Sequence, residues 1–303
     1  MSDATRARHV SRRQWRLPPA LFLIVAVWGL DAVWASWAGI RIGQAGSILA
    51  TLVLLGGNLL LYRGRRGAER ASALLAGVAA FFALASGTAA LSYLAATSGA
   101  PLADRWLARA DAALGFDWRA WQAFVHAHPA LHRLLQFAYA SMSWQILFCL
   151  LALPLAGRTA RNREFILASA LALLPTVALF AAFPAASAWA EYGVMPPPSL
   201  GFLRQLLALR AGQAPVIELG DLYGLVTFPS FHAAAAVLLA NAARGTMFAF
   251  LGAVLNLLML VSALSEGGHY LVDVLAGIAI AVLAIGAARL VLRRFDSGAG
   301  AAL

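Results

Sequence analysis

The sequence contains no lysine, a single cysteine and few acidic residues, and only 12% of its residues are charged. A soluble globular domain carries about twice that charged fraction. Because 62% of the residues are hydrophobic and the mean hydropathy is +0.77, the composition excludes a soluble globular protein and predicts an integral membrane protein. The lone Cys149 lies in an apolar stretch without a partner for an internal disulfide, so it indicates nothing about the redox compartment.

The formal net charge of +10 comes from 23 arginines and 13 acidic residues. Such an excess would suit a nucleic-acid-binding protein, but most of these arginines lie in short loops between apolar stretches. That distribution is typical of a membrane topology signal, so we expect no nucleic-acid partner. The first apolar stretch is too long for a secretory signal peptide and has no clear cleavage site, so we interpret it as a membrane helix.

Eight apolar stretches approach the roughly 20 residues that a helix needs to cross a bilayer. They are Leu17–Ile40, Gly46–Tyr62, Ala71–Ala96, Leu131–Leu155, Phe165–Ala190, Pro229–Ala243, Met247–Leu264 and His269–Val291. Small residues recur in these stretches and permit close helix packing in lipid. We therefore expect an all-α polytopic membrane helix bundle of about eight transmembrane helices.

We expect residues 71–294 to form one six-helix core that includes the outer loops 97–130 and 191–228. Residues 1–70 would add an N-terminal tail and two accessory transmembrane helices, and residues 295–303 a C-terminal tail.

Arginine also predicts the orientation. With a cytoplasmic N-terminus and helices that alternate in direction, 16 arginines lie on the cytoplasmic side and seven on the outer side. An excess of arginine on the cytoplasmic side supports this orientation. Of two polar outer segments, Leu102–His128 is predicted to be interfacial and amphipathic, and Glu191–Phe228 to cover the functional site. We expect a protein of a bacterial inner membrane whose site faces the periplasm or the exterior.

Three ionisable residues at the ends of apolar stretches carry the strongest functional signal. His269 and Asp273 are four residues apart, so in a helix their side chains would share one face. His232 follows Phe-Pro-Ser-Phe at the start of another apolar run. An ionisable pair in an apolar helix is costly and therefore indicates function. Two histidines and a carboxylate are the components of a phosphoryl-transfer site.

Each of these residues also has a purely structural interpretation. A single histidine at a membrane interface can be satisfied by a backbone carbonyl, and Pro229 and Ser230 can simply start a helix. The aspartate favours function, because a carboxylate beneath an imidazole fixes its tautomer and supports an imidazolium. The presence of all three residues on one side of the membrane favours it further.

The two histidine motifs together resemble a known family. Gly224–His232, which reads GLVTFPSFH, and Gly267–Asp273, which reads GGHYLVD, resemble the second and third signatures of the type 2 phosphatidic acid phosphatase superfamily. The likeness is greatest to the inositol-phosphorylceramide-synthase-like branch. The resemblance extends over about residues 71–294, with its specific motifs in the last third. It implies a membrane enzyme that transfers a phosphoryl group of a lipid phosphate or lipid phosphodiester, either as a phosphatase or as a headgroup transferase. Its partners would be that substrate and membrane lipids.

The same resemblance implies a role for each motif residue. His269 would attack phosphorus and form a phosphohistidine, and Asp273 would orient this histidine and balance its charge. His232 would protonate the leaving oxygen and then deprotonate the incoming water or alcohol. An activated nucleophile splits one difficult displacement into two easier steps. No cofactor is implied, and no acidic cluster accompanies the histidines to suggest a metal.

The sequence departs from the superfamily at the residues that would neutralise phosphate. The first signature needs a lysine, which is absent, and Ala263 stands where the third signature has an arginine. Candidate phosphate ligands are therefore Arg210 first, Arg204 second, and the helix starts marked by Ser230 and Gly268. Arg210 could equally face solvent or lipid headgroups.

Two other functional classes remain open from the sequence. A proton-coupled transporter could use the histidine–aspartate pair as a relay, although such pairs would then lie near the membrane midplane. The vacant cation positions also allow a catalytically inactive lipid-binding homologue.

Overall fold

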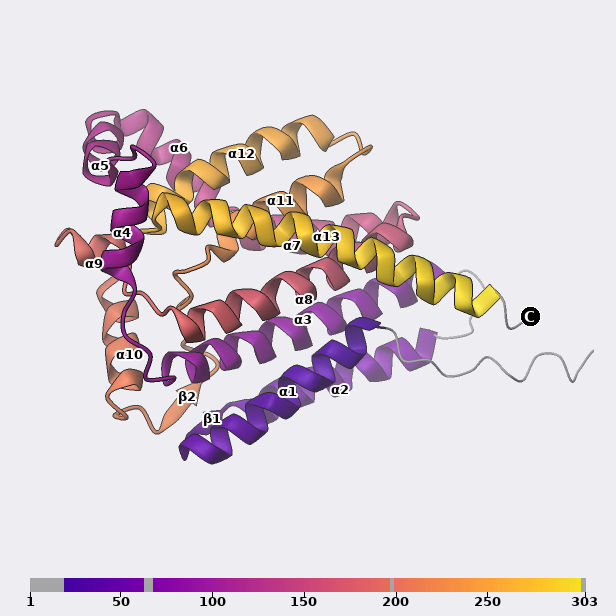
Figure 1. Cartoon of the computed structure of the whole chain (residues 1–303). Coiled ribbons are helices and arrows are strands. Elements are labelled where there is room, and N and C mark those ends of the chain that lie inside the picture. The colour runs from indigo at the N-terminus through magenta and orange to yellow at the C-terminus, as the bar shows by residue number, and fades with distance from the viewer. Residues whose placement is uncertain (1–18, 63–67, 197–198, 301–303) are drawn as a thin grey trace, which may run out of the picture.

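The computed structural model describes residues 19–62, 68–196 and 199–300. Almost all of the secondary structure in these residues is helical (Figure 1), which confirms the predicted all-α membrane bundle. The long apolar helices are α1 (Pro19–Ala38), α3 (Glu69–Ala96), α8 (Thr159–Ala182), α12 (Ala249–Glu266) and α13 (Leu271–Gly300).

The number of membrane-length helices is smaller than the sequence predicted. In the described residues five helices are long and apolar enough to span, and a sixth results if α6 (Pro129–Ala140) and α7 (Met142–Leu155) form one bent span. These two helices meet at an angle of 45°. Two further apolar helices are shorter: α2 (Ala45–Tyr62), whose apolar part is Ala45–Asn58, and α11 (Phe231–Ala243).

The bend between α6 and α7 has a local cause. At the junction, the hydroxyl of Ser141 donates a hydrogen bond of 2.6 Å to the carbonyl of Ala138, and its oxygen accepts one of 2.9 Å from the Gln145 amide. A serine side chain that bonds to the preceding turn competes with the helical backbone and bends it. The hydropathy of this stretch contains no sign of the bend.

The short helices gather at one end of the bundle, the end at which α13 begins (Figure 1). They are α4 (Asp104–Ala113), α5 (Trp118–Ala127), α9 (Ala188–Glu191) and α10 (Leu200–Arg210). Here β1 (Arg41–Gly43), between α1 and α2, also pairs in parallel with β2 (Val216–Glu218), which follows α10. The two segments predicted to lie outside the membrane are thus on the same end of the molecule.

One glycine allows α11 to lie directly against α13. A Cβ atom at Gly277 would overlap the backbone carbonyl oxygen of Ser230 and press on Ala233. In the same contact, the backbone N–H of Ser230 donates to the carbonyl of Asp273 at 3.0 Å. The first turns of α11 and α13 are therefore held side by side, and this brings the two histidine motifs together.

At the opposite end, a polar cluster ties three helices. Glu164 of α8 accepts hydrogen bonds from Arg244, after α11, at 2.8 Å and from Arg289 of α13 at 3.0 Å. The carboxylate is mostly buried, with 13% of the side chain exposed. This clamp fixes the far ends of the helices that carry the histidine motifs.

Candidate active site

The two histidines of the sequence motifs line a single cavity of about 800 Å³. His232 is the second residue of α11, and its ring stacks on Tyr139, with centroids 3.9 Å apart and an angle of 11° between the planes. His269 lies in the loop between α12 and α13 and is only 4% exposed. The structure thus brings together residues that are far apart in the sequence, as the motifs predicted.

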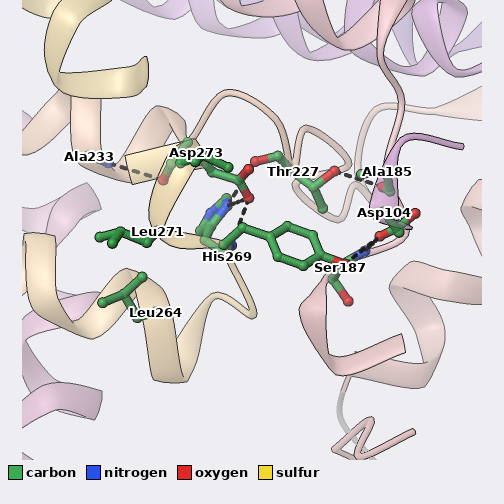
Figure 2. Close-up of polar contacts among 12 residues, drawn as sticks. Asp104, Ala185, Ser187, Thr227, Ala233, Leu264, His269, Leu271 and Asp273 are labelled. Carbon is green, nitrogen blue, oxygen red and sulfur yellow. Dashed lines mark hydrogen bonds and ion pairs between the residues drawn. The ribbon is translucent and has the colours of Figure 1, made fainter. Parts of the chain in front are cut away.

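The hydrogen bonds of His269 define which of its nitrogens is free. Its Nδ1 lies 2.8 Å from the backbone carbonyl oxygen of Thr227 and 3.4 Å from Oδ2 of Asp273 (Figure 2). A carbonyl oxygen only accepts hydrogen bonds, so Nδ1 carries the hydrogen and donates to it. The neutral ring then keeps its lone pair on Nε2.

The pairing of His269 with Asp273 does not arise in the way the sequence suggested. The prediction placed both residues on one face of a helix, but α13 begins at Leu271 and His269 lies before it. Asp273 occupies the first turn of α13, and its Oδ2 accepts the backbone N–H of Tyr270 at 2.9 Å. This contact resembles one half of a capping box. The same carboxylate therefore starts the helix and faces the histidine.

The helix start of α13 is already occupied by a second carboxylate. Asp111 of α4 accepts the backbone N–H groups of Leu271 and Val272 at 2.8 and 2.9 Å. Burial raises the pKa of the Asp111 carboxyl, against the opposing effect of these two donors. Because these N–H groups are taken, the first turn of α13 is not free to bind phosphate, contrary to the expectation for this helix.

The loop that carries His269 is held by further residues of the α4–α5 segment. Asp104 accepts the backbone N–H groups of Ala186 and Ser187 and, at 3.1 Å, the hydroxyl of Tyr270. The indole N–H of Trp118 lies 3.1 Å from the carbonyl oxygens of both Leu264 and His269.

The sequence interpretation missed this scaffold. Residues 102–128 were predicted to be an interfacial amphipathic segment, but Asp104, Leu107 and Asp111 are buried against the site loop. Their spacing places them on one face of α4, and that spacing was the available signal. A face that carries two aspartates indicates helix capping and backbone binding rather than contact with lipid.

The proposed phosphate ligands lie elsewhere. Arg210 donates to the carbonyl of Ala100 at 2.7 Å, and Arg204 is exposed. Ser230 is buried and caps α11, where its side chain accepts the N–H of Ala233 at 3.3 Å. None of these three, nor Gly268, is among the described residues that line the cavity. This placement does not support the two arginines as phosphate ligands, whereas the role of the helix start at Ser230 stays a prediction.

Away from the histidines and Glu266, the cavity lining is mostly apolar. It extends along α3, α7 and α8, where its lining includes Phe81, Phe82, Ile146, Leu150 and Val177. A space of this size, polar at one end and apolar along the rest, suits a lipid whose phosphate lies at the histidines.

A comparison with protein families agrees with the geometry. The family model described as the PAP2 superfamily matches residues 105–287, which is more than half of the chain. The chain belongs to the PAP2 superfamily. This PAP2 match includes both histidines, Asp273 and Asp111. Membership in the PAP2 superfamily indicates a membrane protein with a phosphatase-like function in lipid phosphoryl transfer. No curated protein and no solved structure matches the chain.

Proposed function

We propose that the protein cleaves a lipid phosphate or lipid phosphodiester through a phosphohistidine on His269. The observation that carries this proposal is the hydrogen bond from Nδ1 of His269 to the Thr227 carbonyl, with Asp273 behind it. It leaves the lone pair on Nε2 of a residue that lines the same cavity as His232. A nucleophile and an acid–base residue that share one cavity are the minimum for a double displacement.

In the first step, Nε2 of His269 attacks phosphorus, and the bond from phosphorus to the leaving oxygen breaks. His232 gives its proton to that oxygen. The His269 ring becomes positively charged, and the Thr227 carbonyl and the Asp273 carboxylate stabilise that charge through Nδ1–H. In the second step, His232 takes a proton from water or an alcohol, whose oxygen displaces His269 from phosphorus.

The start of α11 is the best-placed source of donors for the phosphate oxygens. In the described part of the chain, the backbone N–H groups of Phe231 and His232 make no hydrogen bond, and both residues line the cavity. The first N–H groups of a helix have no partner within the helix and carry a partial positive charge. They therefore suit a phosphate that lies between the two histidines.

Whether water or an alcohol enters second distinguishes a phosphatase from a headgroup transferase of the inositol-phosphorylceramide-synthase-like branch. The test uses purified protein with lipid phosphates and phosphodiesters in mixed micelles, scored separately for phosphate release and for headgroup transfer. His269→Ala should abolish turnover and any acid-labile phosphoprotein, and His232→Ala should still trap phosphate from an activated ester. Cys149→Ser, which changes a residue outside this cavity, serves as the matched control.

A loss of about a thousandfold or more is expected for removal of His269 from the catalytic unit. Near-normal turnover in His269→Ala would show that the mechanism is wrong. A proton-coupled transporter or an inactive lipid-binding homologue would instead show no phosphoprotein in the unmodified protein.

A further inference from the structure

The charges around the histidines are unusual for a phosphate site. Among the described residues that line the cavity there is no arginine, and the one acidic residue is Glu266. Its side chain is 12% exposed and lies three residues before His269 in the chain. A carboxylate in such a position repels a bound phosphate unless a positive charge lies between them.

The protein itself supplies little to neutralise Glu266. Its one ion-pair partner in the described part of the chain is His132, with Nε2 3.4 Å from Oε1 of Glu266. That same Nε2 lies 3.2 Å from the side-chain amide nitrogen of Gln136, which donates to it. Glu266 thus shares this nitrogen with Gln136, and its 3.4 Å contact with His132 is an ion pair only when that ring carries a charge. Consistent with this, Oε1 of Glu266 is buried without a hydrogen-bond partner.

Aromatic rings lie on both sides of the loop that follows Glu266. A Cβ atom at Gly267 would meet the ring of Tyr139, and one at Gly268 would meet the ring of Trp189. Both rings line the cavity. A carboxylate and aromatic rings that line one cavity are the kind of surroundings that bind organic ammonium groups, by charge and by the negative face of the ring.

We propose that the substrate is a zwitterionic phospholipid, whose headgroup carries a positively charged amine a few bonds from the phosphate, and that Glu266 binds this amine. The proposal rests on the proposed function and adds the substrate class. The substrate then brings the positive charge that the cavity lining lacks, and its amine separates Glu266 from the phosphate. A phospholipid with only negative charge places an uncompensated anion beside Glu266 and binds less well.

The experiment compares four phospholipids with identical acyl chains and one fluorescent label each in mixed micelles. Phosphatidylethanolamine and phosphatidylcholine carry an amine, whereas phosphatidylglycerol and phosphatidic acid do not. We expect the two amine-bearing lipids to have the higher kcat/KM. Glu266→Gln should lower kcat/KM for them by roughly tenfold to a hundredfold, the range for loss of one buried charged partner. It should leave the other two lipids within about threefold.

Two control variants separate recognition from structure. Glu191→Gln removes an exposed carboxylate outside the cavity and should leave all four lipids unchanged. His132→Gln removes the neighbouring ring. If His132→Gln produced the same selective loss as Glu266→Gln, the pair would be structural and the proposal would be overturned.

A second measurement needs no variant. Phosphoethanolamine and phosphocholine should inhibit the unmodified protein at lower concentration than glycerol phosphate. Equal inhibition by glycerol phosphate, or an equal loss on all four lipids in Glu266→Gln, would overturn the proposal. If an activated ester still phosphorylates His269 while no headgroup preference exists, only the substrate class is wrong. If no phosphoprotein forms, the proposed function itself fails.

Discussion

A single methyl group at Gly277 should separate the two histidines. The Cβ atom of Gly277→Ala would overlap the backbone oxygen of Ser230 rather than the end of a flexible side chain, so α11 has to move as a unit. A displacement on the order of 1 Å is needed to restore normal contact, and a misplacement of that size at a catalytic group costs about a hundredfold in rate. His232, two residues after Ser230, would move with the helix.

The effect on stability should be much smaller than the effect on rate. Overpacking lowers the free energy of unfolding by about 1–3 kcal/mol. Replacement of a helical glycine by alanine raises it by about 1 kcal/mol. The free energy of unfolding should therefore fall by no more than about 2 kcal/mol while kcat falls about a hundredfold.

The matched control for this prediction is Gly286→Ala on the same helix. A Cβ atom at Gly286 meets nothing within 4 Å, so this change should leave kcat unaltered and stabilise the fold slightly. Thermal unfolding and turnover of both variants in the same detergent provide the comparison. If Gly277→Ala were as active as Gly286→Ala, close contact between α11 and α13 would not be what positions the histidines.

Three further predictions concern other parts of the molecule. Asp111→Ala leaves two partly buried N–H groups at the start of α13 without partners, so it should lower the free energy of unfolding by about 2–4 kcal/mol, measured by thermal unfolding, and reduce kcat; unchanged stability would contradict the capping role. Because Arg210 lies outside the cavity lining, Arg210→Ala should match the exposed Arg133→Ala in kcat/KM within about threefold, whereas a loss of tenfold or more would identify it as a phosphate ligand. In a Cys149→Ser background, a cysteine at Gln213 should react with an impermeant reagent added to intact cells; reaction only after permeabilisation would reverse the predicted orientation.

The sequence predicts the fold and the meeting of the histidines because both depend on features visible along the chain. Long apolar runs identify membrane helices regardless of how they pack. His232 and His269 each stand at the start of an apolar run, and helices that alternate across a membrane bring such starts to one side. Those inferences use only the apolar runs in the sequence and the alternating direction of successive membrane helices.

What the sequence did not show depends on backbone contacts between distant segments. Nδ1 of His269 makes its short contact with the backbone carbonyl of Thr227. Every residue has a backbone carbonyl, so the amino-acid sequence does not show which one lies beside the histidine. Asp111 contacts Leu271 across 160 positions of sequence, and only the folded chain shows which helix start a carboxylate occupies. The short length of α11 follows from its cap at Ser230 and from its end before Arg244. Hydropathy is averaged over a window of residues and therefore does not show where a helix begins and ends.

The position of α13 in the chain has a consequence for biosynthesis. This helix is the last one described, it carries Asp273 and Gly277, and His269 lies two residues before its first residue. A ribosome therefore synthesises α1 to α12 before it adds His269, the proposed nucleophile. On the proposed function, the site is complete only once α13 has docked against α11 and His269 lies beside the cavity that His232 lines.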